Sequence, residues 1–183
     1  CPTTLKWKVA ISHSQKELRI LQRILNNLPD NYTLRIDANG GWDRKTARIW
    51  CEHIVDEPRI QWIEQPLRAD DFSGLWELGK LFPIALDESL LLDRSLIIRW
   101  PGWQVRRPIL EGDPRVLLAQ LEKGLGHVMI STGFETGIGR RWVNHLAALQ
   151  QNGPTPTAPG LAPGWFPKGS LFSFDPEVVW RAA

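Results

Sequence analysis

Three acidic residues, Asp37, Glu64 and Asp87, each end a short run of β-forming residues. They stand 27 and 23 residues apart, which is enough for one strand, one crossover helix and two loops per step. In a parallel barrel the carboxyl ends of the strands open on the same mouth, so this spacing brings the three carboxylates together. Such like charges repel one another unless a divalent cation neutralises them, and all-oxygen ligation suits Mg²⁺ or Mn²⁺. The sequence therefore predicts a Mg²⁺ site, with Mn²⁺ as the alternative ion.

Two lysines of the opening strand, Lys6 and Lys8, share one strand face, because side chains alternate along a strand. Removing a proton from carbon beside a carboxylate requires a base, and the resulting dianionic enolate must be stabilised, which a divalent cation does. A lysine serves as that base only when its pKa is lowered, and burial near other cations lowers it. Lys8 is the best placed candidate. The alternative is that both lysines are solvated residues of an edge strand.

The elements that position these residues alternate between strands and helices. Ser14 with Glu17 predicts a capping box at the first helix, and Asp43 and Asp113 are expected helix N-caps. The expected strands are 5–9, 33–37, 60–64, 84–87, 103–107, 127–131 and a last short one at 158–161. The expected helices run from 14 to near Pro29, from 43 through Ile54, over 71–81, near 93–99, from 113 to about 123 and over 138–151.

This alternation predicts an α/β fold with a parallel sheet, either a (β/α) barrel or a doubly wound sheet. A barrel is favoured, because candidate polar residues end nearly every strand, whereas an open sheet concentrates its site at a switch point. About seven strands are counted, one short of eight, and the shortfall lies at the start. Since the sequence opens at Cys1 without Met and enters a strand almost at once, an upstream portion is expected. Residues 1–183 are thus interpreted as one partial (β/α) barrel catalytic domain.

Composition excludes several classes of protein. The chain has 183 residues, of which 43% are hydrophobic, so it can bury a sizeable core and is not expected to be disordered. A net charge of +2 with scattered basic residues argues against nucleic-acid or membrane partners. Cys1 and Cys51 do not form a disulfide framework or a metal motif, and no apolar stretch is long enough to span a membrane. A cytoplasmic location is expected.

Several motifs, in register along the whole chain, resemble the barrel-domain signatures of the enolase superfamily. They are Leu5-Lys-Trp-Lys8, Arg35-Ile-Asp-Ala-Asn-Gly-Gly-Trp42, Trp62-Ile-Glu-Gln-Pro-Leu67, Ala85-Leu-Asp-Glu-Ser89 and Ser131-Thr-Gly-Phe-Glu-Thr-Gly-Ile-Gly139. Within the superfamily they most resemble the o-succinylbenzoate synthase family. The resemblance implies a Mg²⁺-dependent lyase of menaquinone and phylloquinone biosynthesis. It would dehydrate the small-molecule carboxylate 2-succinyl-6-hydroxy-2,4-cyclohexadiene-1-carboxylate to o-succinylbenzoate.

The resemblance also implies residue roles. Asp37, Glu64 and Asp87 would be the metal ligands, Lys8 the base that takes the α-proton and later assists loss of water, and Lys6 its electrostatic support. The residues that would shape the substrate site are Asn39, Ser131, Thr132, Glu135, Gly160 and Leu161.

One departure from the family pattern concerns the sixth barrel strand, where Arg107 stands at the family's second lysine, just before Pro108. Arginine stays protonated, so Arg107 can act as a fixed cation but not as a proton donor and acceptor. This suits a dehydratase and argues against a racemase. A shift of one residue, with Arg106 inside instead, is the alternative, and Pro108 favours Arg107.

A second departure is that the superfamily's N-terminal capping domain and first barrel strand are not found in the sequence. Three functional alternatives follow: an N-acylamino acid racemase, a cycloisomerase, or a non-catalytic barrel fragment. The sequence makes no prediction of oligomeric state.

Overall fold

The computed structural model describes residues 3–165 and 167–182, so the expectations stated for Cys1 lie outside the described residues. The chain divides into two compact units, Cys1–Gln104 and Val105–Ala183, which are described one at a time. The single catalytic domain over 1–183 stays a prediction.

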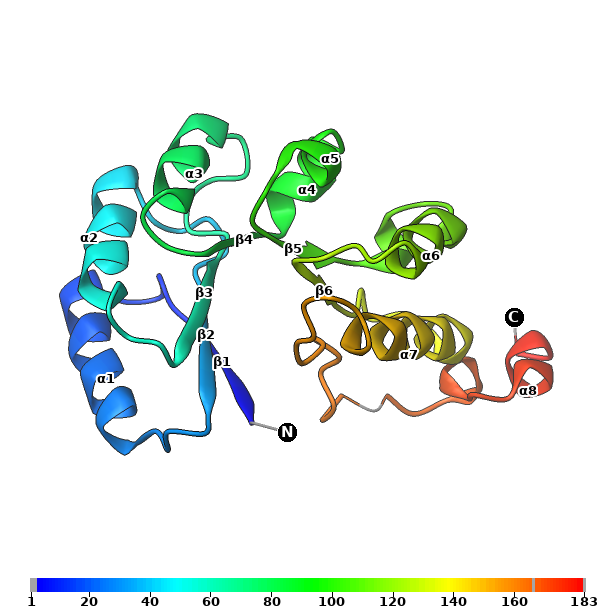
Figure 1. Cartoon of the computed structure of the whole chain (residues 1–183). Coiled ribbons are helices and arrows are strands. Elements are labelled where there is room, and N and C mark those ends of the chain that lie inside the picture. Colours follow the sequence, from blue (N-terminus) through cyan, green and yellow to red (C-terminus); the bar gives the residue numbers. More distant parts are fainter. Residues whose placement is uncertain (1–2, 166, 183) are drawn as a thin grey trace. The chain divides into compact units, whose positions relative to one another are not determined.

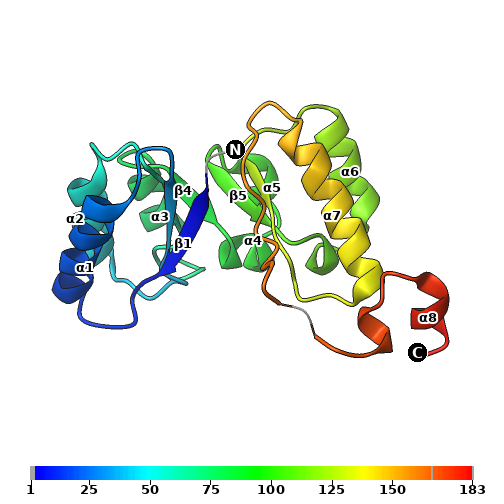
Figure 2. The ribbon, with the colours of Figure 1, turned by 90° about the horizontal axis from the view of Figure 1, so that it is seen from below.

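The first unit is a parallel sheet whose strands follow one another in sequence order, each joined to the next by a helical connection (Figure 1). Its strands are β1 (Thr4–Lys8), β2 (Thr33–Asp37), β3 (Ile60–Glu64), β4 (Ile84–Leu86) and β5 (Trp103–Arg106), of which the last continues into the second unit. Its helices are α1 (Ser14–Asn27), α2 (Arg44–Ile54), α3 (Phe72–Gly79), α4 (Glu88–Leu92) and α5 (Leu96–Arg99). Figures 1 and 2 show α1, α2 and α3 on the same side of the strands.

The alternation of side chains along each strand explains this arrangement. On β2, Leu34 and Ile36 are buried in the main core with residues of the flanking helices, including Leu21 of α1 and Trp50 of α2. The intervening residues are polar and face the other side of the sheet. The predicted cap of α2 is confirmed, because Asp43 accepts a hydrogen bond of 2.7 Å from the backbone N–H of Thr46. The strand faces thus separate a hydrophobic core from a polar face.

The second unit contains the end of β5, strand β6 (Val128–Ile130) and the helices that cover them. These helices are η1 (Pro108–Leu110), α6 (Pro114–Glu122), α7 (Gly137–Gln151), η2 (Ser170–Phe172) and α8 (Pro176–Trp180). Figure 2 shows α6 and α7 side by side, and a small core that includes Leu117, Leu121, Val143 and Leu146 joins them. Asp113 caps α6 as predicted, by accepting from the N–H of Arg115.

Several details differ from the sequence-based expectations. The strands β4, β5 and β6 end one residue earlier than expected, so Asp87, Arg107 and Ser131 follow these strands. The expected strand at 158–161 is reduced to one bridge, in which Gly160 pairs with Ser131. The segment 88–99 forms two short helices rather than one. The capping box at α1 is wrong, because His13 is the N-cap and Glu17 turns instead to the preceding loop, where it accepts from the N–H groups of Ala10, Ile11 and Ser12.

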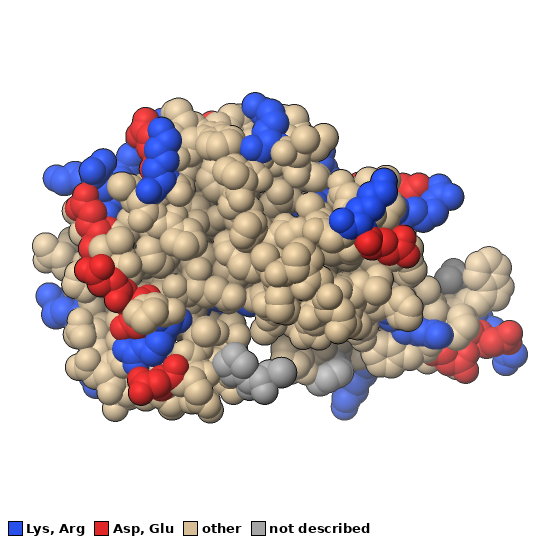
Figure 3. Space-filling model, in the orientation of Figure 1, with Lys and Arg blue, Asp and Glu red and all other residues tan. Residues whose placement is uncertain are grey.

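On the visible face of the space-filling view (Figure 3), the charged side chains do not gather by sign. Figure 3 shows Lys and Arg interspersed with Asp and Glu on the visible face. No helix in the described ranges is both long and apolar enough to cross a membrane.

Candidate functional site

The register of the sheet lines up the candidate residues of the first unit. Lys8 pairs with Asp37, Asp37 with Glu64, and Glu64 with Ala85 on successive neighbouring strands. The base candidate and two of the three acidic residues thus form one row at the carboxyl ends of β1, β2 and β3. Asp87 lies two residues beyond Ala85, so it stands further along the chain than this row.

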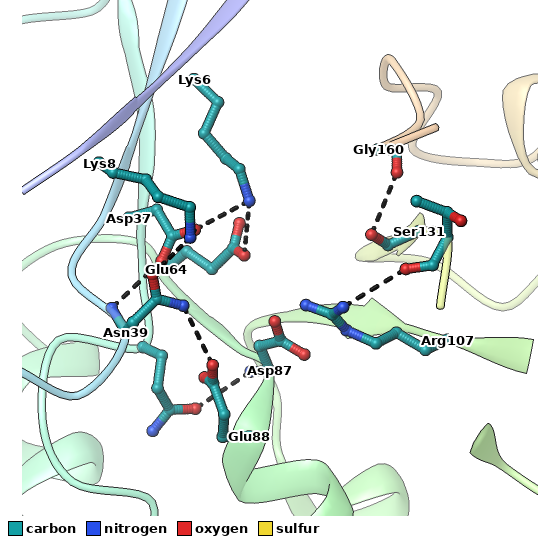
Figure 4. Close-up of polar contacts among 12 residues, drawn as sticks. Lys6, Lys8, Asp37, Asn39, Glu64, Asp87, Glu88, Arg107, Ser131 and Gly160 are labelled. Carbon is teal, nitrogen blue, oxygen red and sulfur yellow. Dashed lines mark hydrogen bonds and ion pairs between the residues drawn. The ribbon is translucent and has the colours of Figure 1, made fainter. Parts of the chain in front are cut away.

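The two lysines contact the acidic residues directly (Figure 4). The Nζ of Lys6 lies 2.8 Å from Oδ2 of Asp37 and 3.0 Å from Oε1 of Glu64, so its ammonium bridges the two carboxylates. The Nζ of Lys8 lies 3.1 Å from the same Oδ2 of Asp37. It also donates to Oδ1 of Asn39 at 2.5 Å. The structure therefore brings Lys6, Lys8, Asp37, Asn39 and Glu64 into one hydrogen-bonded cluster.

Burial and charge act against each other in this cluster. Burial lowers the pKa of Lys6, but the charges of Glu64 and Asp37 outweigh it and hold that pKa above its ordinary value. The pKa of Asp37 is lowered, because burial, which raises it, is outweighed by Lys6 and Lys8. The pKa of Glu64 is raised, first by burial and then by the like charges of Asp37 and Asp87, although Lys6 opposes the shift. Of Asp37 and Glu64, Glu64 is therefore the carboxylate whose charge is less well compensated.

That Asp37, Glu64 and Asp87 share one ion stays a prediction. Within residues 3–165 and 167–182, no three His, Cys, Asp or Glu side chains are grouped so as to hold a metal ion. The Lys6 ammonium lies between the first two carboxylates, and the sheet register leaves Asp87 beyond their row.

The donor chemistry of the same three residues nevertheless fits a hard divalent cation. Asp37 and Glu64 are 0% exposed and Asp87 is 1% exposed, and the Oε2 of Glu64 is buried without a hydrogen-bond partner. A buried acceptor oxygen without a donor is costly, and a cation would satisfy it. These residues could therefore hold Mg²⁺.

The environment of Lys8 differs from the expectation in one respect. Burial near other cations was expected to prepare it as a base, but its side chain is 56% exposed. What holds it is the pair of acceptors on Asp37 and Asn39, with the Lys6 ammonium sharing the same Asp37 oxygen.

Sequence reasoning missed Gln65, which is 0% exposed. Its Oε1 accepts from the N–H groups of Asp87 and Ser89, both at 3.1 Å. Its Nε2 donates to the Ser89 hydroxyl and to the carbonyl of Leu67. Gln65 thus fixes the turn that carries Asp87. The only signal in the sequence was its place directly after Glu64, in the quoted motif.

In the second unit, Arg106 ends β5 and Arg107 follows it, and their side chains lie in different surroundings. Arg106 is 2% exposed and forms a bidentate ion pair with Glu111. Arg107 is half-buried and its Nη1 donates to the carbonyl of Thr132 at 3.3 Å. Arg107 therefore lies beside Thr132, one of the expected substrate-site residues of this unit, whereas Arg106 is buried in its ion pair with Glu111.

The remaining expected site residues form a second cluster, in the second unit. Ser131 donates to the carbonyl of Gly160 at 3.2 Å, and a Cβ at Gly160 would come within 2.9 Å of the Ser131 hydroxyl. Thr132 donates to the carboxylate of Glu135 at 3.0 Å. The carbonyl of Leu161 accepts from Arg140 at 2.7 Å. Glu135 is buried and also accepts from the N–H of Gly133, so it holds its own loop.

The chain is similar to known proteins both in sequence and in structure. The family described as enolase C-terminal domain-like matches residues 2–92. The o-succinylbenzoate synthase of Thermosynechococcus vestitus is 37% identical over 159 residues, which cover 81% of this chain and 49% of that protein. The chain thus spans about half the length of the curated relatives it matches.

Solved structures agree with this. The o-succinylbenzoate synthase of Thermosynechococcus elongatus BP-1, complexed with Mg in the active site, has a TM-score of 0.83 and 32% identity, covering 99% of this chain and 59% of that one. Muconate cycloisomerase from Pseudomonas fluorescens has a TM-score of 0.67 and 26% identity, covering 78% and 42%. With its parallel strands, its interleaved helices and its five motifs in register, this chain belongs to the enolase superfamily and has the barrel-type fold of the enolase C-terminal domain.

Proposed function

We propose that this chain carries out the dehydration performed by o-succinylbenzoate synthases, with Lys8 as the base. The observation that supports it most is the cluster in which Lys8 and Lys6 meet the buried carboxylates of Asp37 and Glu64. The likeness to the Thermosynechococcus enzyme over 81% of the chain supports the choice of substrate, 2-succinyl-6-hydroxy-2,4-cyclohexadiene-1-carboxylate. The cofactor proposed is Mg²⁺, and Asp37, Glu64 and Asp87 would hold it.

Lys8 has two roles in this reaction, first as a base and then as an acid. Its neutral amine takes the proton from the carbon next to the substrate carboxylate, and the electron pair moves into that carboxylate. The ammonium so formed then gives a proton to the departing hydroxyl group, which leaves as water while the ring becomes aromatic. Bound Mg²⁺ would supply positive charge for the substrate carboxylate while it carries the extra negative charge. Lys6 keeps its proton, because Glu64 and Asp37 raise its pKa, and adds a fixed positive charge beside Lys8.

Arg107 is proposed as a second fixed cation. A guanidinium does not give up its proton near neutral pH, so it can stabilise negative charge but cannot deliver a proton to the opposite face of the substrate carbon. This favours dehydration over racemisation, for which an acid or base is needed on each face.

The test is formation of o-succinylbenzoate by the full chain with Mg²⁺, followed by chromatography. Lys8→Ala is expected to lower turnover by at least about a hundredfold, the lower range for loss of a general base. It should leave the affinity for Mg²⁺, measured by calorimetry, within a few-fold of the original. Lys16→Ala, which changes an exposed lysine of α1, is the matched control and should retain full turnover.

The outcomes separate the alternatives. Full turnover in Lys8→Ala would refute the assigned base. Saturable Mg²⁺ binding without product would point to another superfamily reaction, and exchange of the α-proton of an N-succinylamino acid in both antipodes would identify a racemase. Absence of saturable Mg²⁺ binding would support the non-catalytic alternative.

A further inference from the structure

Asn39 stands between Lys8 and a second acidic residue, Glu88. The Oδ1 of Asn39 accepts from the Lys8 Nζ at 2.5 Å, and its Nδ2 donates to Oε1 of Glu88 at 3.1 Å. Figure 4 shows Glu88 and Lys8 on opposite sides of this amide. The three side chains therefore form a relay in which each end of the Asn39 amide has one partner.

The backbone of Asn39 is already fixed by its surroundings. Its φ of 44° lies in the left-handed region, which asparagine tolerates better than most residues. The N–H of Asn39 donates to Oδ1 of Asp37 at 3.2 Å, and the N–H of Gly40 donates to the carbonyl of Gln65 at 2.7 Å. What these contacts leave open is which end of the side-chain amide faces Lys8. An oxygen facing the ammonium attracts it, whereas an NH₂ group facing it would repel it.

Glu88 is itself held in place. It follows Asp87 in the turn whose N–H groups, those of Asp87 and Ser89, are bound by Gln65. The Oε2 of Glu88 is buried without a hydrogen-bond partner, so Oε1 is the oxygen through which this carboxylate acts. Asn39 is exposed and lines a pocket of about 370 Å³ with Gln65 and Glu88, so water can take the place of the Glu88 carboxylate at the Asn39 amide when that carboxylate is removed.

We propose that Glu88 is a positioning residue for Lys8 and acts through Asn39. By accepting from Nδ2, it fixes the orientation in which Oδ1 faces the lysine, and so it holds the amine on the row formed with Asp37. Only the description of Lys8 as the base depends on the function proposed above, since the relay is a feature of the fold. Glu88 is thus distinct in role from Asp87, its neighbour in the sequence.

The relay is tested without substrate, by the rate at which an amine-acylating reagent modifies Lys8. Peptide mass spectrometry gives this rate, with Lys16 as the internal reference. In Glu88→Leu we expect Lys8 to react roughly two- to tenfold faster, the factor that one net hydrogen bond represents. Glu88→Gln retains an acceptor oxygen and should keep the original rate. Glu52→Leu, which removes an exposed carboxylate of α2, is the matched control and should also keep it.

A double-mutant cycle separates this role from a general loss of structure. Asn39→Gly, which suits the left-handed backbone at this position, should raise the Lys8 rate at least as much as Glu88→Leu does, and adding Glu88→Leu to it should change nothing further. An unchanged Lys8 rate in Glu88→Leu, or a further increase when it is combined with Asn39→Gly, would overturn the proposal. Because no turnover is required, the result holds even if the chain proves not to dehydrate the proposed substrate.

Where turnover is found, kcat gives a second readout. Glu88→Leu should lower kcat about fivefold, as expected for one misplaced hydrogen bond, with little change in KM, and Glu88→Gln should restore most of it. A change confined to KM would mean that Glu88 contacts substrate instead.

Discussion

The loop that follows Lys8 depends on one buried carboxylate, that of Glu17, and this dependence can be measured. Glu17 is 3% exposed and accepts from the N–H groups of Ala10, Ile11 and Ser12 at 2.9–3.0 Å. In Glu17→Gln the side chain keeps its shape. Its single oxygen can still serve Ile11 and Ser12, but its NH₂ group then faces the N–H of Ala10, so one buried donor loses its acceptor.

The expected cost follows from these contacts. An orphaned buried donor costs about 1–3 kcal/mol, and the two remaining bonds lose the extra strength that a charged acceptor provides, so we expect a total of about 2–4 kcal/mol. For a chain of this size, each kcal/mol lowers the melting temperature by about 2–4 °C. The melting temperature of Glu17→Gln should therefore be roughly 5–15 °C lower than that of the original chain, and Glu17→Leu should lower it further.

Urea unfolding followed by far-UV circular dichroism gives the free energy of unfolding directly. Glu52→Gln, at an exposed site on α2, serves as the control and should stay close to the original chain. A loss below about 0.5 kcal/mol in Glu17→Gln, within the range of ordinary surface changes, would refute the reasoning.

Four further predictions concern stability and reactivity. Burial raises the pKa of the Cys51 thiol to about 12 from its ordinary 9.0. Because the unfolded state loses this proton at lower pH than the folded state does, the free energy of unfolding should fall as the pH rises above 9.0. Cys51→Ala should remove this contribution to the pH dependence, as measured by urea unfolding at several pH values. At pH 8 the folded chain should not react at Cys51 with a thiol reagent, and rapid labelling would contradict the burial. Gly160→Ala places a Cβ within 2.9 Å of Met129 Sδ and should destabilise by about 1–3 kcal/mol in thermal melts, an effect that would be absent if the bridge to Ser131 were open. Asp43→Ala removes the cap of α2 and should cost about 1 kcal/mol, whereas Asp30→Ala, in an exposed loop, should cost almost nothing.

The sequence predicted the elements well where local signals were strong. The strands at 33–37 and 60–64 were predicted to the residue, and the helix caps Asp43 and Asp113 bind as expected. These features depend on period-two alternation and on capping chemistry, which neighbouring residues decide.

The predictions were less accurate where a side chain's contacts depend on other segments of the chain. Glu17 has the spacing of a capping-box residue, but its carboxylate accepts instead from three backbone N–H groups of the preceding loop. The contact of Lys6 with both Asp37 and Glu64 depends on the strand register, which the sequence of one strand does not specify.

The hydrogen bonds of Gln65 have a consequence for how this fold can change over time or by design. They connect the loop after β3 directly to the turn after β4, without passing through the intervening helix α3. Substitutions at exposed positions of α3, such as Glu77, should therefore leave Asp87 in place, whereas Leu75 and Leu78 of the same helix belong to the core. Replacement of Gln65, in contrast, should remove the hydrogen bonds that connect the two loops.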